Sequence, residues 1–174
     1  MIRLFICLAV ALGSAASSAA SQTRSVSDTD LAYFIGEWEG TVHFPQDSVV
    51  NHAPPRFVWT VSIILDDHWL EGTVDIEGER FTKEFLGVDP ATGELLRFVV
   101  VADGSTLRFR SHGWDQDTLI WLGSMNQDGV AFELREDIQR KGDDAFDAVF
   151  FRRVDGEWQR MQSEMLKRKQ ERGP

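Results

Sequence analysis

The sequence has few of the residues on which disulfide-stapled folds and most catalytic centres depend. Its 174 residues include one cysteine, Cys7, and four histidines. A single cysteine cannot form an intramolecular disulfide, so the folded chain must be stabilised by its hydrophobic core. The sequence also contains no G-x-S-x-G nucleophile motif, no phosphate-binding glycine loop and no H-E-x-x-H zinc motif. No catalytic motif can therefore be assigned.

Basic residues and long apolar runs are also scarce. The chain has 18 lysines and arginines against 28 aspartates and glutamates, a net charge of −10. This balance argues against nucleic acid or an anionic membrane as the main partner, but it leaves a cationic or neutral ligand possible. No segment is long and apolar enough for stable membrane insertion. The sequence does not indicate an oligomeric state.

The N-terminus has the pattern of a signal peptide. Arg3 precedes an apolar stretch over 4–13, and small residues follow up to Ala20. Such a stretch suits secretion and is too short to span a bilayer. We expect residues 1–20 to be removed and the protein to be secreted, into the periplasm if the source is a bacterium with two membranes. The alternative is an ordinary buried N-terminal helix.

The rest of the chain is predicted to be one domain of short strands. Residues 21–27 are polar and expected to be disordered, and Ser27 is predicted to cap a short helix over 28–35. From Gly36 onward, apolar and polar residues alternate as in half-buried strands. The predicted strands are 37–44, 57–65, 69–76, 80–88, 95–102, 106–111, 118–123, 130–136, 145–153 and 158–167. Residues 45–55 form a long loop that could bind a ligand or act as a lid.

These strands predict an all-β fold. Turn signals recur without a helical interlude, which is typical of an antiparallel meander, sandwich or barrel. We expect a closed barrel of about 8–10 strands over residues 28–168, because closure removes exposed sheet edges. A basic tail, 169–174, follows the barrel.

Three short segments resemble lipocalin-like (calycin) barrels. Gly36-Glu37-Trp38-Glu39-Gly40 resembles their G-x-W-x-G opening. Two further segments, 87–93 (G-V-D-P-A-T-G) and 69–72 (W-L-E-G), are similar to a family of uncharacterised secreted bacterial proteins. The resemblance implies that Trp38 is a structural plug at the closed end of the barrel. Nitrobindin-type barrels are more distantly similar and bind haem through a late histidine, but this chain has no histidine after His112, so we expect no cofactor.

Aromatic residues give the strongest indication of a site. Alternation assigns several rings to the barrel interior, where they could line an apolar ligand cavity. Ser111 could add a polar contact, and His112 is the best candidate for a functional histidine. The predicted ligand-binding residues are Trp59, Phe98, Phe109, Ser111, His112, Trp121 and Phe132. The alternative is that the rings simply fill the core.

Charged residues are predicted to lie elsewhere. Carboxylates alternate with apolar residues and are assigned to the solvated outer face, as are Arg108 and Arg110. Asp66-Asp67-His68 is interpreted as a polar turn and not as a metal site, because adjacent side chains rarely converge on one ion.

Three functional hypotheses follow. The first is a barrel that binds a small apolar or amphipathic molecule. The second is an isomerase or hydrolase on the same scaffold that uses His112 or His68 as an acid or base. The third is a filled barrel that acts as an interaction protein of the cell envelope.

Overall fold

The computed structural model describes residues 26, 29–45, 55–127 and 129–170. One 3-10 helix, η2 (Asp30–Phe34), precedes eleven strands. The strands are β1 (Gly36–His43), β2 (Arg56–Ile64), β3 (Trp69–Ile76), β4 (Glu79–Val88), β5 (Leu95–Val101), β6 (Thr106–Ser111), β7 (Trp114–Asp115), β8 (Thr118–Gln127), β9 (Val130–Arg140), β10 (Ala145–Val154) and β11 (Glu157–Arg168).

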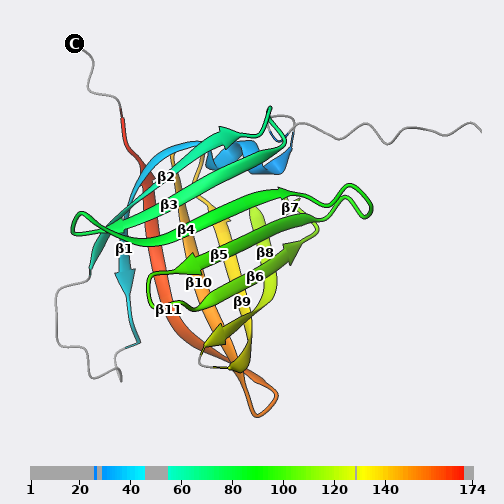
Figure 1. The fold of residues 1–174 in the computed structure, drawn as a ribbon. Coiled ribbons are helices and arrows are strands. Elements are labelled where there is room, and N and C mark those ends of the chain that lie inside the picture. Colours follow the sequence, from blue (N-terminus) through cyan, green and yellow to red (C-terminus); the bar gives the residue numbers. More distant parts are fainter. Residues whose placement is uncertain (1–25, 27–28, 46–54, 128, 171–174) are drawn as a thin grey trace, which may run out of the picture.

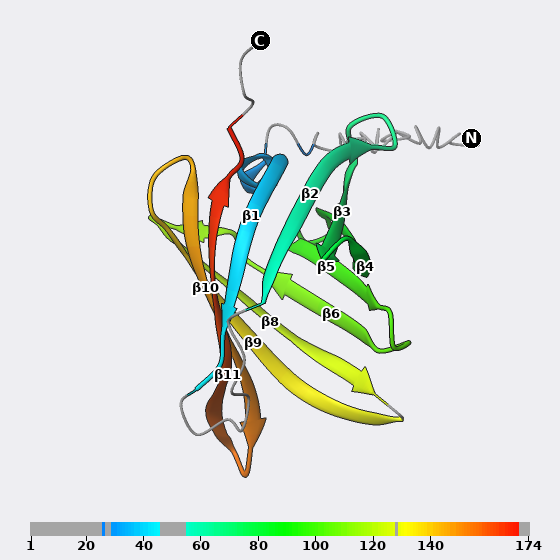
Figure 2. The same cartoon turned by 90° about the vertical axis from the view of Figure 1, so that its left-hand side faces the viewer.

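The strands form a closed antiparallel barrel of ten strands (Figure 1). Successive long strands pair with one another, and β1 pairs with the last strand, β11, beside which it lies in Figure 2. Pairing of β6 with β8 completes the ring, while the two-residue strand β7 pairs with β8 alone. This architecture confirms the predicted fold class. Strand β7 was not predicted, since it lies in the polar stretch from His112 to Asp117.

Closure at β6–β8 depends on a glycine. A Cβ atom added to Gly123 on β8 would lie 2.0 Å from the backbone oxygen of Arg108 on β6. Gly123 pairs directly with Phe109 in this ladder. The two strands therefore approach more closely here than any side chain would allow, and a backbone oxygen cannot be moved as a flexible side chain can.

Alternation along the strands builds the core. In β1, Trp38, Gly40 and Val42 are buried, while their neighbours are more exposed. The other long strands of the barrel also have a buried inner face, and the buried hydrophobic residues form one cluster. Because a barrel interior is filled from all sides, short strands with a period of two are enough to specify it.

Helix η2 covers one end of the barrel (Figure 1). Trp38 is fully buried there, and its Nε1 donates to the carbonyl oxygen of Phe34 at 2.8 Å. The Arg168 guanidinium lies 4.1 Å from the centre of the Trp38 ring and donates to the carbonyl oxygen of Tyr33 at 2.9 Å. Phe146 packs edge-on against Trp38, with a centroid distance of 5.0 Å. Trp38 thus lies at a closed end, where the resemblance places it.

The N-terminal predictions need correction. The helix spans Asp30–Phe34 and is a 3-10 helix, and its N-cap is Thr29, whose side chain accepts from the Leu31 amide. Val26, assigned to a disordered segment, is fully buried and its amide donates to the Asp67 carbonyl oxygen at 2.9 Å. Tertiary packing therefore orders this residue despite its polar neighbours. The predicted signal peptide, 1–20, and the rest of 21–27 apart from Val26 lie outside the described residues.

The opposite end carries the β3–β4, β5–β6, β8–β9 and β10–β11 hairpin turns. The predicted loop or lid joins this end between β1 and β2, but its residues 46–54 lie outside the described part of the chain. At the C-terminus, Lys169 ion-pairs with Glu37 of β1, so the predicted tail begins as a continuation of the barrel wall. No described helix is long and apolar enough to cross a bilayer.

Candidate functional site

A cavity of about 410 Å³ occupies the half of the barrel away from η2. Its walls are mostly apolar and come from nearly every strand. Side chains that line it include Phe57, Val99, Phe109, Met125, Leu134 and Phe150. Phe44, Phe81 and Met161 line the same cavity and are each more than a third exposed, so they mark its mouth. The volume is within the range of small-molecule sites in proteins.

The floor of the cavity is a buried ion-pair network. Arg97 on β5 donates through Nε to Oε2 of Glu84 on β4 at 2.9 Å. Its Nη1 donates to Oε2 of Glu136 on β9 at 2.5 Å. The Arg97 side chain is 12% exposed, and the two carboxylates are 2–3% exposed. Thr82 adds a hydroxyl that donates to Glu84 at 3.3 Å. The Arg97 guanidinium thus pairs with two carboxylates, one on β4 and one on β9, which are not neighbouring strands.

A third carboxyl group, that of Glu164 on β11, belongs to the same floor. Glu164 lines the large cavity, and Val42 and Ala148 are its partners on the neighbouring strands. Among the described residues its only hydrogen bond comes from Gln162 Nε2, which donates to Oε1 at 2.7 Å. Within the described part of the chain no ion pair joins it to a cation, whereas Glu84 and Glu136 both contact Arg97.

Burial shifts the protonation equilibria of this cluster. Desolvation raises the pKa of Glu136 to about 7, although the charge of Arg97 opposes the shift. Desolvation, reinforced by the negative charge of Glu136, raises the pKa of Glu164 to about 8. Burial alone would lower the pKa of Arg97, but attraction by Glu136 and Glu84 outweighs it and raises that pKa. Near neutral pH the barrel therefore holds a permanent cation next to carboxyl groups that retain protons.

A small void of about 30 Å³ lies beneath the network. It shares Glu84, Arg97 and Glu164 with the large cavity and is also lined by Trp59 and Trp121. The Nε1 atoms of both tryptophans are buried without a hydrogen-bond partner among the described residues. The void has room for one water molecule.

The structure places the aromatic residues predicted to line the cavity in different surroundings. Phe109 faces the large cavity, and Arg97 lies 5.8 Å from the centre of its ring. Trp59 and Trp121 face inward as expected, but they line the small void beneath the network and not the large cavity. They form the lower side of the floor, among the aromatic rings packed under η2.

Phe98 is wrongly assigned to the interior. Arg97 and Val99 line the cavity, so Phe98, between them on β5, points outward, where Arg108 lies 5.6 Å from its ring. The error is a shift of one residue, which moves every side chain of a strand to the other face. Phe132 shares the inner face of β9 with Leu134, but it contacts Arg152 near the strand end and does not line the cavity.

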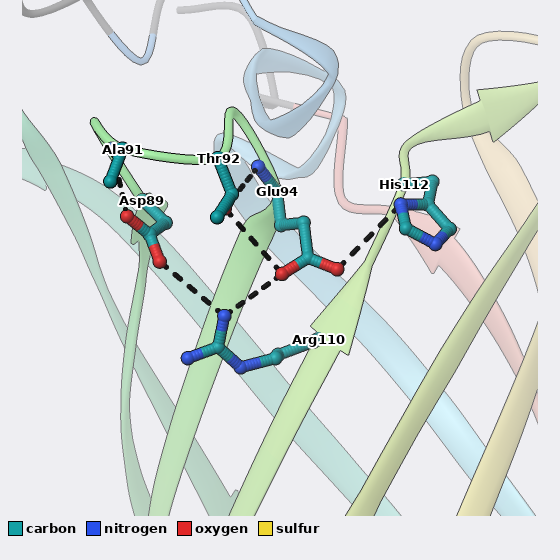
Figure 3. A network of polar contacts seen from close by, with 6 residues as sticks. All are labelled: Asp89, Ala91, Thr92, Glu94, Arg110 and His112. Atoms are coloured by element: carbon teal, nitrogen blue, oxygen red, sulfur yellow. Dashed lines mark hydrogen bonds and ion pairs between the residues drawn. The ribbon is translucent and has the colours of Figure 1, made fainter.

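Ser111 and His112 lie at the end of the barrel that η2 covers. Ser111 is buried, and its Oγ accepts from the Gly113 amide at 3.2 Å, which fixes a turn. The His112 side chain is 93% exposed and lies 3.6 Å from Glu94. Figure 3 shows it at the edge of a surface network in which Arg110 joins Glu94 and Asp89. His112 is therefore far from the mouth of the cavity.

The polar floor was missed by the sequence interpretation, which assigned carboxylates to the outer face. Each of these charged residues is flanked two positions away by an inward apolar residue, as in Leu95-x-Arg97-x-Val99 and Leu134-x-Glu136-x-Ile138. That period of two was the available signal. It was overlooked because isolated buried charges are rare, and the compensating partners lie on other strands.

The floor offers hydrogen-bonding and acid–base chemistry. Glu136 and Glu164 can take up or release protons near neutral pH, and Arg97 holds a fixed positive charge. Within the described part of the chain, no three histidine, cysteine, aspartate or glutamate side chains are grouped so as to hold a metal ion. His68 is exposed in the β2–β3 turn, away from the cavity.

Comparisons with known proteins identify the fold and no family. No family model matches the sequence, and no curated protein matches it. Among solved structures, the chain is similar to the crystal structure of Rv2717c from M. tuberculosis, with a TM-score of 0.59 and 16% identity. The alignment covers 80% of this chain and 95% of that chain. At this identity the likeness concerns the barrel fold alone.

Proposed function

We propose that this protein is exported and binds a small apolar or amphipathic molecule inside the barrel. The observation that carries the proposal is the cavity of about 410 Å³, which is open at one end and closed by a packed plug at the other. Burial of apolar ligand surface there would contribute roughly 25 cal/mol per Å². The polar floor would orient the ligand.

Export is part of the proposal and rests on the sequence. The apolar stretch over 4–13 and the small residues before residue 21 have the form of a cleavable signal. Mass determination of the protein expressed with its natural N-terminus tests it. A mature chain that begins near Ser21 supports export, and an intact N-terminus contradicts it.

The two alternative functions, a filled interaction barrel and a histidine-dependent enzyme, have less support. A filled barrel would leave no room for a ligand, which does not fit a cavity of this size. An enzyme that relies on His112 or His68 would need one of them at the cavity, yet both are exposed at the opposite end of the barrel. The carboxyl groups of the floor are better placed for chemistry, but no reacting geometry singles them out.

A cavity-filling substitution tests the binding site with a matched control. Val99 and Val100 are adjacent on β5, but Val99 lines the cavity while Val100 is exposed on the outside. In Val99→Phe the larger ring would enter the cavity, and in Val100→Phe it would remain in solvent. The neutral fluorescent probe N-phenyl-1-naphthylamine is suited to titration of all three proteins.

We expect saturable one-to-one binding by the wild-type protein and by Val100→Phe, with at least about tenfold weaker binding by Val99→Phe. A tenfold loss corresponds to about 1.4 kcal/mol. Circular dichroism and thermal unfolding confirm that each variant is folded. Equal binding by both variants, or no saturable binding by the wild-type protein, would contradict the proposed site.

A further inference from the structure

The charges of the cavity are unequal. Among the described residues, three acidic ones line it, Glu84 and Glu164 at the floor and Asp103 near the mouth, and Arg97 is the only basic one. Glu136 lies directly behind Arg97. The backbone amide of Ser105 donates to Asp103 and lowers the pKa of that carboxyl, so the mouth retains a negative charge. The interior therefore favours a positive group over a negative one.

Arg97 already pairs with two carboxylates of the floor. Its Nε and Nη1 atoms are directed at Glu84 and Glu136, and both carboxylates are almost fully buried. A ligand carboxylate near Arg97 would have to compete with the carboxylates that already contact the guanidinium. Like charges at such distances in a desolvated site are strongly unfavourable.

Of the two floor carboxyl groups that line the cavity, Glu164 is the one without an ion-pair partner among the described residues. It lines the cavity beside Gln162, and its Oε2 atom has no hydrogen-bond partner among the described residues. Phe57, Val74 and Leu134 line the same cavity and offer apolar contacts to the remainder of a ligand. An unpaired polar acceptor next to apolar side chains is the arrangement that orients an amphipathic ligand.

A second observation indicates that the floor is more than a structural network: some of its buried hydrogen-bond donors have no acceptor. Two buried donors, Trp59 Nε1 and Trp121 Nε1, have no acceptor among the described residues and line the void that Glu136 and Glu164 also line. Buried polar groups in structural networks are nearly always satisfied, and exceptions point to a water, an ion or a function. A water molecule there could accept from an indole and donate to a carboxylate, and so stabilise the charged floor.

We infer that the ligand is an amphipathic amine, whose ammonium group pairs with the Glu164 carboxylate and whose apolar part fills the cavity. This inference rests on the proposed function and specifies its ligand class. The groups that face Glu164 are Glu136 on β9, Glu84 on β4 and Arg97 on β5. The three carboxyl groups outnumber the single guanidinium, and an ammonium ion would add a second positive charge to the cluster.

Proton release accompanies this binding mode. Below its pKa of about 8, Glu164 holds a proton in the unliganded barrel. When an ammonium ion enters, the carboxyl O–H bond breaks, the proton passes to solvent and the carboxylate pairs with the ammonium. Up to one proton per ligand is therefore released at pH 7, and affinity for the amine rises with pH as Glu164 ionises.

Three probes of equal chain length separate the ligand classes: decylamine, decanol and decanoate. Isothermal titration at pH 7 in two buffers with different ionisation enthalpies gives both the affinity and the number of protons released. We expect decylamine to bind about tenfold or more tightly than decanoate, with net proton release for decylamine alone.

Glu164→Gln tests the assigned residue. Glutamine has the shape of the protonated glutamate, so the variant should fold, and it should lose the amine preference and the proton release. Glu157→Gln makes the same chemical change at an exposed position of the same strand and should bind as the wild-type protein does.

The possible outcomes test the amine assignment separately from the proposed ligand-binding function. If decanol or decanoate binds as tightly as decylamine, the barrel binds amphiphiles but the amine assignment is wrong. If Glu164→Gln keeps the preference, the assignment to Glu164 is wrong. If none of the three probes binds and N-phenyl-1-naphthylamine also fails to bind, the proposed function itself is contradicted.

Discussion

Arg97 on β5 and Glu136 on β9 meet inside the barrel, with 2.5 Å between Nη1 and Oε2. The two strands are not neighbours in the ring, since β6 and β8 lie between them. The ion pair therefore spans the barrel interior and divides it into an aromatic half under η2 and a half that contains the cavity. We expect both the stability of the barrel and the shape of its binding cavity to depend on this contact.

Loss of the Arg97 charge should destabilise the protein in a pH-dependent way. In Arg97→Met, Glu84 and Glu136 lose their buried cation, and we expect a loss of about 3–5 kcal/mol in the free energy of unfolding at pH 8. At pH 5 Glu136 holds a proton, so the loss should be smaller. Urea unfolding at both pH values measures it. An equal loss at both would show that Arg97 acts through packing alone.

A triple variant checks the same network. Arg97→Met combined with Glu84→Gln and Glu136→Gln removes the cation and both of its carboxylates together. Because replacement of a whole buried ionic cluster is often neutral, we expect this variant to recover most of the stability lost by Arg97→Met. No recovery at pH 8 would mean that uncompensated charge is not the cause of the loss.

Wild-type stability should fall as pH rises from about 5 to 9. The folded-state pKa values of Glu136 and Glu164, about 7 and about 8, lie above the usual 4.5, so the folded state binds more protons than the unfolded state in this interval. Each group then contributes a slope of up to about 1.4 kcal/mol per pH unit. Urea unfolding at several pH values measures the slope. Glu164→Gln should reduce it, and Glu157→Gln should not; a rise in stability over this interval would contradict the pKa shifts.

Gly123→Ala should disrupt closure of the barrel. The new Cβ atom would meet the Arg108 backbone oxygen at 2.0 Å, and β6 and β8 would have to separate. We expect a loss of about 3 kcal/mol or more, above the usual cost of an overpacked side chain. Hydrogen exchange of the β6 and β8 amides would report the opening. Ser124→Ala, at the next position of β8, is the control and should change stability little.

Trp38→Ala should lower stability without selective loss of binding. Trp38 is fully buried beneath Arg168 and η2, at the end opposite the cavity mouth. We expect a loss of about 3–5 kcal/mol in the free energy of unfolding. At temperatures where the variant remains folded, its affinity for N-phenyl-1-naphthylamine should equal that of the wild-type protein. A selective loss of affinity would place Trp38 in the binding site.

The sequence was sufficient to predict the strands and insufficient to predict their inner faces. Strands β3 and β6 were predicted with the bounds observed, because turns and alternation are local properties. Strands β8 and β9 extend four residues further than predicted, since pairing satisfies the backbone of polar residues as well. Local alternation does not identify partners on distant strands. Those partners decide which way Phe98 points and why three glutamates, Glu84, Glu136 and Glu164, lie inside the barrel.

The most direct test of the central claim is native mass spectrometry of the protein expressed with its natural N-terminus and purified from the compartment in which it accumulates. The account predicts a stoichiometric additional mass that is released on denaturation, retained by Val100→Phe and lost by Val99→Phe. An unliganded mass for the wild-type protein that stays unchanged after incubation with N-phenyl-1-naphthylamine and decylamine would contradict a ligand-binding barrel.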